Sequence, residues 1–519
     1  MLGIVLQWYW PNAFQYHYTM IVIGFLLVAF VFFLSYSARF IYGFIGTIGS
    51  YLFFVGCGVL LCFKKDIRND TNWYGLFSNE KKYYKVQILD QAQSTAKTIR
   101  TIAKVRQVWI NDKWVNTKGN CLLYFLKKDS SEFNSGLIPI PNKGDNIIIN
   151  AKGITITNSN NDFNQQRFWL TEKTTHRFFL HYYNWKIIDG QKTRAFNLDT
   201  LRAKILKALR LGIKDKEALG LAEALLIGYR KDLDKELIKD YTNTGVVHII
   251  AISGLHIGLI YTILLLLFRP LEKIKAIKWL IIPIALLIVW VFSLLAGASP
   301  SVLRSAVLFT CIGVGKMINR KSMSINTMAF SAVLLLLYNP FWLWDLGFQL
   351  SYSAVLSILL FHRPIYNAIE ISKKWVDYIW ESLSLTLSAQ ILTTPISLYW
   401  FHQFPVYFLI SNLIAVPLSG IILTIELGIC ALYSWTWAVK YLGKTAEFFI
   451  LTLNKIVNYI GGLPGAVIQG INIRFVQVIL LYGLIGAISY GLKQKTKVSM
   501  LYFLILLIFT IGSFVSSPP

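Results

Sequence analysis

Apolar residues are concentrated in two long stretches, residues 19–63 and 243–515, while polar residues collect between 64 and 242. Runs such as Met20–Tyr36, Ile277–Leu295 and Leu501–Phe514 approach or reach the roughly 20 residues that a helix needs to cross a bilayer. This pattern predicts a polytopic α-helical membrane protein of about twelve spans, with one soluble domain inserted after the first helices.

The order of these stretches predicts four parts of the chain. Residues 1–66 are expected to form an N-terminal transmembrane helix pair, 67–195 a soluble domain, 196–242 amphipathic helices and 243–519 the main membrane domain. Between residues 80 and 190, β-rich runs separated by turn residues predict about five strands, which suits an all-β, OB-like barrel. The amphipathic helices either lie on the membrane surface or, as we favour, pack on the bundle.

The distribution of charge predicts which side of the membrane each loop faces. The formal net charge is +25, with only 15% of residues charged. Basic residues gather in alternate loops of the main membrane domain, at Lys273, Lys278, Lys316, Arg363, Lys373, Lys440 and Lys444. By the positive-inside rule these loops are cytoplasmic, so the soluble domain is expected on the extracytoplasmic side. Anionic membrane lipids account for part of the positive charge.

The soluble domain is basic in its own right, since residues 64–199 carry ten more Lys and Arg than Asp and Glu. Three basic residues, Arg100, Lys104 and Arg106, share one face of a predicted strand, and Trp109 and Trp114 flank the turn that follows. Basic strand faces with aromatic side chains bind single-stranded nucleic acid in many OB-folds. The alternative is that this face is simply solvated.

The run from Thr244 to Gly258, TGVVHIIAISGLHIG, opens the main membrane domain. It places His248, Ser253 and His256 at membrane depth, where polar groups usually face a bundle interior or a wet cavity. For the serine and the glycines we favour helix packing, which small residues commonly provide between membrane helices. We therefore expect the two histidines to line or gate a cavity.

Three further motifs follow. Pro300, after a cluster of Gly, Ala and Ser, predicts a helix break and a new N-terminus, with Arg304 one turn inside the new helix. Asp345 either caps the next helix or pairs with Arg304, and Gln349 lies one turn further on. Helix breaks are also predicted at Pro395 and Pro417, on either side of the polar residue Asn412.

These motifs resemble those of the ComEC family of competence DNA-uptake channels, whose pattern is close to T-G-x-x-H-x-x-A-x-S-G-L-H-x-G, A-S-x-S-x-x-R, G-F-Q-L-S and N-x-x-x-x-P. All four occur here in order, beginning at Thr244, Ala298, Gly347 and Asn412. The segments Asn161–Asn164 and Arg167–Leu170 resemble the end of the family's OB-fold.

The resemblance implies a multi-pass protein of the bacterial inner (cell) membrane that transports one DNA strand inward in natural transformation. The channel would be lined or gated by His248, Ser253, His256, Arg304, Asp345, Gln349 and Asn412. Many members also carry a metallo-β-lactamase-like nuclease domain, and no H-x-H-x-D-H cluster occurs here. The expected partners are single-stranded DNA, a cytoplasmic ATPase motor, an extracytoplasmic DNA receptor and a separate nuclease, with homo-oligomer formation left open.

No covalent chemistry is required by this interpretation, so the protein is not expected to be an enzyme. The five cysteines include no C-x-x-C pair, and nothing supports a metal or another cofactor. Gly443-Lys444-Thr445 lacks the earlier glycine of a phosphate-binding loop, so energy would come from an ATPase partner or the membrane gradient. The alternatives are an intramembrane hydrolase using Ser253 and His256, with Asp345 as third member, and a small-anion transporter.

Overall fold

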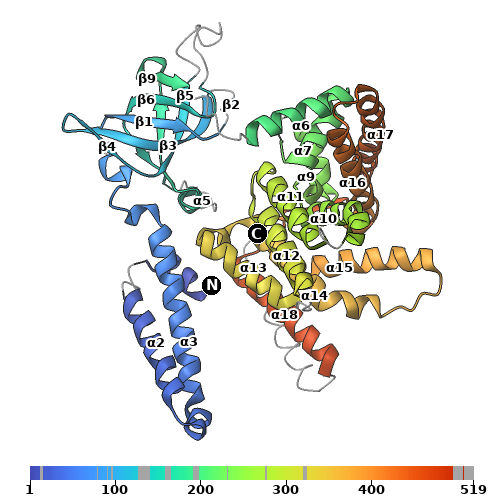
Figure 1. Ribbon diagram of the computed structural model, residues 1–519, viewed down its shortest axis with the longest axis horizontal. Helices are drawn as coiled ribbons and strands as arrows, with labels where there is room; N and C mark the ends of the chain where they lie inside the picture. The colour runs from blue at the N-terminus through green and yellow to red at the C-terminus, as the bar shows by residue number, and fades with distance from the viewer. Residues whose placement is uncertain are drawn as a thin grey trace. The chain divides into compact units, whose positions relative to one another are not determined.

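The computed structural model describes residues 1–11, 16–78, 80–90, 92–94, 98–126, 141–157, 165–190, 198–230, 232–274, 278–318, 324–494 and 507 (Figure 1). The chain divides into two compact units. One comprises Met1–Ala195 and Leu336–Leu343, and the other comprises Phe196–Leu335 and Trp344–Pro519. The predicted segment Asn161–Asn164 and the apolar run Leu501–Phe514 lie outside the described residues, apart from residue 507.

The first unit begins with three helices, α1 (Leu2–Tyr9), α2 (His17–Phe33) and α3 (Tyr36–Lys65). Helices α2 and α3 lie side by side (Figure 1) and approach closely at glycines. A Cβ added to Gly24 would lie 2.7 Å from the carbonyl oxygen of Gly49. Small residues of this kind let apolar helices pack backbone to backbone in a membrane.

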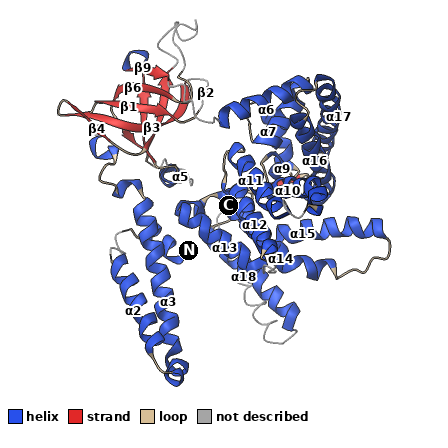
Figure 2. Cartoon of the chain, in the orientation of Figure 1, coloured by secondary structure: helices blue, strands red, loops and turns tan. Residues whose placement is uncertain are grey.

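A sheet follows, built from β1 (Lys82–Ile88), β2 (Gln93–Ser94), β3 (Thr98–Ile110), β4 (Lys113–Asn116), β5 (Asn120–Leu126), β6 (Asp145–Ala151), β7 (Ile154–Thr155), β8 (Thr174–Leu180) and β9 (Trp185–Gly190), with helix α5 (Gln165–Thr171) before β8 (Figure 2). The strand order is β7-β8-β5-β3-β1-β6-β9, with β2 and β4 paired to β3. Only the β5–β8 pairing is parallel among these strands. The predicted β region is therefore confirmed.

Alternating burial holds this sheet together. Along β3 every second residue from Ile99 to Val105 is buried, and the apolar ones pack with Tyr84, Phe125 and Phe178 in one core. The period of two leaves the intervening residues on the outer face. The β-rich run Trp114–Leu126, which the sequence pattern would make a single strand, forms two strands, β4 and β5, because Gly119 adopts a φ of +125° between them.

The second unit is helical. It contains α6 (Leu198–Gly212), α7 (Lys216–Ile227), α8 (Lys235–Asn243), α9 (Val247–Ile250), α10 (Gly254–Phe268), α11 (Ile281–Leu295), α12 (Pro300–Met317), most of α13 (Ser324–Tyr338), α14 (Leu346–Tyr366), α15 (Lys374–Phe401), α16 (Phe408–Ala431), α17 (Thr436–Gly461) and α18 (Phe475–Gln494). Two short strands, β10 (Gln403–Pro405) and β11 (Val467–Gln469), form a separate pair.

Four stretches of the described chain are long and apolar enough to cross a membrane: Tyr36–Lys65, Gly254–Lys273, Lys278–Leu295 and Phe408–Ala431. Three shorter apolar helices accompany them. Other long helices, such as α15 and α17, carry charged side chains and do not qualify on composition. A membrane protein with several apolar helices is supported, and the figure of twelve spans stays a prediction.

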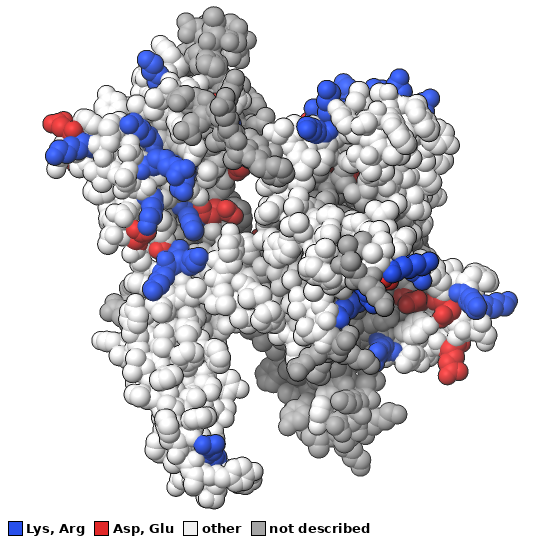
Figure 3. Space-filling model, in the orientation of Figure 1, with Lys and Arg blue, Asp and Glu red and all other residues white. Residues whose placement is uncertain are grey.

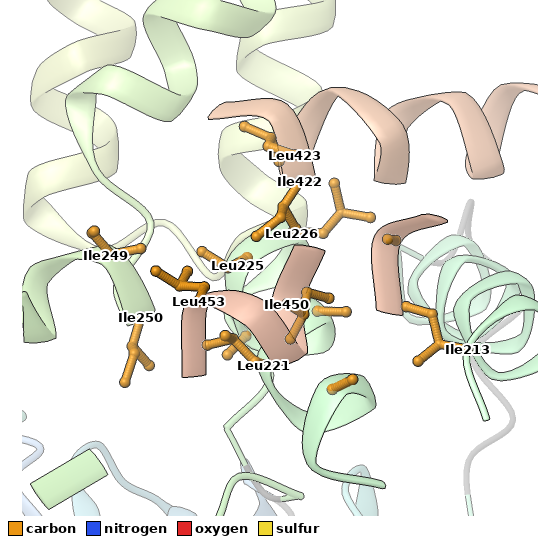
Figure 4. Packing of buried hydrophobic residues seen from close by; sticks show 14 of the residues in the cluster. Ile213, Leu221, Leu225, Leu226, Ile249, Ile250, Ile422, Leu423, Ile450 and Leu453 are labelled. Atoms are coloured by element: carbon orange, nitrogen blue, oxygen red, sulfur yellow. The ribbon is translucent and has the colours of Figure 1, made fainter. Parts of the chain in front are cut away.

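The amphipathic segment packs into the bundle rather than lying apart from it. Buried residues of α6 and α7 join those of α16 and α17 in the largest apolar cluster of this unit (Figure 4). Gly212 and Gly443 meet backbone to backbone at the crossing of α6 and α17. The Asn454 side chain of α17 accepts from the hydroxyl of Tyr241 (2.8 Å) and donates to Glu217 (2.7 Å). Helix α7, almost wholly buried, thus reaches into the bundle.

Two predicted helix breaks are wrong. Pro395 lies inside α15 and Pro417 inside α16, and both helices continue through them. A proline removes one backbone N–H donor, but tight packing among neighbouring helices offsets that loss, so a proline alone does not end a membrane helix. Pro300, in contrast, is the first residue of α12, directly after the N-cap Ser299.

Protonation of His176 is expected to destabilise the sheet. Its buried ring bonds to Ser78 (2.8 Å) and Thr175 (2.9 Å), and burial lowers the pKa of His176 from 6.5 to about 4. Between these values the unfolded chain binds a proton that the folded chain does not. Stability present above pH 6.5 is therefore lost as the pH falls towards 4, by about 3 kcal/mol at most.

Hydrogen–deuterium exchange of β5 and β8 in the full chain, corrected for the intrinsic effect of pH, measures this loss. The variant His176→Gln should show a flatter pH profile, while His181→Gln, outside this buried network, should follow the parent protein. An identical profile for His176→Gln and the parent would contradict the prediction.

Candidate functional site

The first motif forms a broken helix rather than a continuous one. Helix α9 ends at Ile250, residues 251–253 are non-helical, and α10 begins at Gly254. The two predicted histidines differ in environment, because His248 is exposed on α9 whereas only 1% of His256 is exposed. The break leaves the N-terminal N–H groups of α10 inside the unit, where they carry partial positive charge.

Ser253 and His256 form a helix cap. The backbone N–H of Ser253 donates to Nδ1 of His256 (3.3 Å), and the serine side chain accepts from the backbone N–H of His256 in return. This reciprocal pair is a capping box, which holds the break in place. A hydrolase needs the serine hydroxyl to donate to the imidazole. In the cap, the hydroxyl accepts from the backbone of His256 and the imidazole accepts from the backbone of Ser253.

The second motif brings a cation to this break. A tight turn through Gly297 (φ +87°) and Ala298 (φ +52°) leads into α12, and Arg304 lies one turn inside that helix. A Cβ added to Gly254 would lie 3.1 Å from Nη2 of Arg304 and 2.8 Å from Oγ of Ser305. The guanidinium therefore sits against the N-terminus of α10.

The third motif holds Arg304 from the other side. Its Nη1 donates to the backbone carbonyl of Ser351 (2.5 Å), and its guanidinium lies 5.6 Å from the ring centroid of Tyr352. The Tyr352 hydroxyl in turn bonds to Ser331 (3.0 Å). A cation above an aromatic face is stabilised by the ring's quadrupole. The contacts of Arg304 with Tyr352 and with the Ser351 carbonyl were not predicted from the sequence, where Tyr352 was expected only on the same helix face as Asp345 and Gln349.

Arg304 has no acidic partner among the described residues. Only 8% of the residue is exposed, and its Nε has no hydrogen-bond partner in the described part of the chain. Asp345 was predicted either to cap a helix or to pair with Arg304, and in the structure it is a helix cap. Its carboxylate accepts from the N–H of Phe348 (2.7 Å) at the start of α14. Gln349, one turn on, is partly buried.

The fourth motif contacts the beginning of the first. A Cβ added to Gly245, which has a φ of +77°, would lie 3.0 Å from Cβ of Phe408 at the start of α16. The Asn412 side chain is buried and donates to the carbonyl of Phe408 in its own helix (2.8 Å). The first motif thus joins α16 at Gly245 and α12 at Gly254, whereas Asn412 is satisfied locally.

The outer face of the sheet in the first unit carries the predicted basic residues. Arg100, Lys104 and Arg106 alternate with buried residues along β3. The Arg100 guanidinium lies 5.7 Å from the ring of Trp169, and Arg106 donates to Gln87 (2.6 Å). Figure 3 shows Lys and Arg side chains gathered over this domain.

Aromatic side chains extend this face. Trp109 and Trp114 pair across β3 and β4 with centroids 5.2 Å apart, and Lys85 lies 4.2 Å over Trp114. On the other side of β3, Tyr124 is opposite Arg100 and stacks on Phe179, with centroids 5.2 Å apart and ring planes at 23°. Because side chains alternate between the two faces of a strand, the positions of Tyr124 in β5 and Phe179 in β8 could have identified this second pair from the sequence. No three metal-ligating residues cluster within the described chain.

A family model described as "Competence protein" matches residues 225–495, which include all four membrane motifs. The chain is 32% identical to "ComE operon protein 3" of Bacillus subtilis over 205 residues, 39% of this chain and 25% of that protein. It is 27% identical to "Recombination protein 2" of Haemophilus influenzae over 237 residues, covering 44% and 30%. An uncharacterized Aquifex aeolicus protein is 21% identical over 315 residues, covering 60% and 69%.

The match therefore spans between a quarter and a third of the length of the first two relatives. No solved structure matches the chain.

Adding a methyl group at Gly254 should disturb the position of Arg304. The new Cβ in Gly254→Ala would press on Ser305 and Arg304, and overpacking of this kind costs about 1–3 kcal/mol. Thermal unfolding in detergent measures the loss. Gly420→Ala in α16, whose Cβ would meet nothing nearer than 3.9 Å, is the matched control and should be neutral.

The double variant Gly254→Ala/Ser305→Ala removes the closer of the two obstacles and should recover part of the lost stability. Equal melting temperatures for Gly254→Ala and the parent would show that the contact is not tight.

Proposed function

This chain belongs to the competence protein family, and we propose that it is an inner-membrane channel through which single-stranded DNA enters a bacterium during natural transformation. The family match over residues 225–495 supports a role in competence. The channel role is inferred from the polar groups that the four motifs place inside an apolar helical unit. The surrounding apolar helices support a location in the membrane.

One observation carries the proposal: the buried guanidinium of Arg304 faces the N-terminus of α10 without an acidic partner among the described residues. Arg304 also lies near the N-terminus of its own helix, where a positive charge is unfavourable. A buried cation in such a position is stabilised by an anion. Phosphate groups of a passing strand would supply that negative charge in turn.

The basic and aromatic face of the sheet is the proposed site of strand capture. In the described strands, β1 pairs with both β3 and β6, and β5 runs parallel to β8, which supports the interpretation as an OB-like domain. Arg100 and Lys104 would contact phosphates, while the stacked rings of Tyr124 and Phe179 offer a platform for bases. We place this domain on the extracytoplasmic side on the strength of the basic loops.

The same proposal implies partners that this chain does not provide by itself. A cytoplasmic ATPase or the membrane gradient would supply energy, a receptor outside would deliver DNA, and a separate nuclease would remove the second strand. Anionic lipids would contact the basic loops, and self-association is compatible with this arrangement. A small-anion transporter would use Arg304 in a similar way, but it would need no DNA-binding face. An intramembrane hydrolase is disfavoured, because Ser253 and His256 cap α10.

Uptake of labelled DNA tests the channel. A strain without this gene should accumulate no protected internal label, and complementation with Arg304→Ala should reduce internal label at least tenfold at equal protein level, because phosphates lose their counter-charge. Arg363→Ala, an exposed arginine at the end of α14, is the control and should restore normal uptake. Normal internal label in the deletion strain would reject the proposal.

Binding of single-stranded DNA to the full chain in nanodiscs tests the sheet face separately. Tyr124→Ala should weaken binding about tenfold, because base stacking is worth about 1–3 kcal/mol, and should leave the salt dependence unchanged. Arg100→Ala should instead reduce the slope of log K against log salt by about 0.7, the value for one phosphate contact. Lys152→Ala, at an exposed lysine after β6, should change neither. Unaltered binding in all three variants would exclude this face.

A further inference from the structure

Glu426 is an acidic residue in an apolar setting that the motifs do not include. It is the only Asp, Glu, Lys or Arg between Glu381 and Lys440. It lies in α16, one of the helices apolar and long enough to span a membrane. An ionisable residue in such a helix is costly and usually marks a functional position.

The carboxyl group is fully enclosed. Glu426 is 0% exposed, and neither Oε1 nor Oε2 has a hydrogen-bond partner in the described chain. Ile422 and Leu423, one turn before it, and Ile429, almost one turn after it, belong to the apolar cluster shared with α6, α7 and α17 (Figure 4). An isolated carboxylate cannot be held in these surroundings, so the group takes up a proton instead.

Charged and titratable groups on the helices packed against α16 are engaged elsewhere or face outward. On α6 and α7, Arg210 pairs with Glu223 (2.8 Å), and on α17 Glu447 accepts from the N–H of Lys214 (2.8 Å). Among the others, Lys204 and Lys207 (α6), Lys440, Lys444 and Lys455 (α17), His248 (α9) and Glu381 (α15) are exposed. Arg202 (α6) donates to the carbonyl of Ile227, Glu217 (α7) accepts from Asn454, and Asp377 (α15) accepts from Tyr366. On α10, His256 caps its helix and Tyr261 is buried in a separate apolar cluster. Cys430, one turn along α16, is the nearest titratable neighbour on the same helix.

A line of buried polar residues connects Glu426 to the fourth motif. Asn412, Ser419 and Glu426 recur every seven residues along one side of α16, and all three are buried. Successive members are about 10 Å apart, since a helix rises 1.5 Å per residue. Water between them could carry a proton along this side once α16 moves away from its neighbours.

We propose that Glu426 is a proton-binding site of the membrane unit, closed in the neutral acid form in this conformation. The carboxylate gains one proton from the aqueous phase when α16 separates from the cluster, and the site closes again once the charge is neutralised. Release of the same proton on the opposite side would let a proton gradient drive the movement of α16. The protonation of Glu426 does not depend on the proposed channel function, whereas its coupling to DNA movement rests on that function.

Infrared spectroscopy of the full chain in nanodiscs tests the protonation directly. At neutral pH the parent protein should show the carbonyl band of a protonated carboxyl group without hydrogen bonds, and Glu426→Gln should lose it. The control Glu381→Gln, at an exposed position of α15, should retain the band. Since the side chain is neutral in both forms, Glu426→Gln should also melt within a few degrees of the parent. A spectrum unchanged by Glu426→Gln would overturn the proposal.

Transport into proteoliposomes tests the coupling. With the outside acidic, the parent should import labelled single-stranded DNA severalfold faster than without a pH gradient, and Glu426→Gln should lose this stimulation while Glu381→Gln keeps it. An equal response in Glu426→Gln and the parent would overturn the coupling. If the parent imports no DNA, the channel function fails instead, and the infrared result still decides whether Glu426 binds a proton.

Discussion

The membrane unit depends on one electrostatic constraint, the burial of a positive charge without a negative partner in the described chain. Arg304 is held by the Ser351 carbonyl and the Tyr352 ring, which position the guanidinium but do not neutralise it. The capping box at the start of α10 fixes a second source of positive potential beside it. Three motifs that are far apart in the sequence therefore meet in one region of the apolar bundle, where they create a positive electrostatic potential.

The sequence predicted the elements better than the contacts between them. Alternation along β3 identified its basic face, and the small residues before Pro300 located the start of α12, because both are local properties of the chain. The breaks at Pro395 and Pro417 were wrong, since helix packing decides whether a proline interrupts a helix. The choice between the two roles of Asp345 needed the spatial neighbours of Arg304, which no local pattern contains.

The two units offer different physical environments to their polar side chains. The sheet exposes charged and aromatic side chains on a face whose interior is a conventional apolar core, so water screens its interactions and salt weakens them. The helical unit keeps a few polar groups away from water, where each interaction is stronger and each unpaired group is expensive. Weak and reversible binding suits the first environment, and selection by charge suits the second.

The non-helical link between α9 and α10 has a mechanical consequence. Gly245 lies close to the start of α16 and Gly254 lies close to α12, so the eight residues between them, α9 and the link included, act as a spacer of fixed length. Lengthening or shortening the spacer by one residue would shift one contact against the other and turn α10 by about 100°. The number of residues between Gly245 and Gly254 therefore sets the distance between α12 and α16. Insertions and deletions in this part of the chain should be tolerated poorly, even where substitutions are accepted.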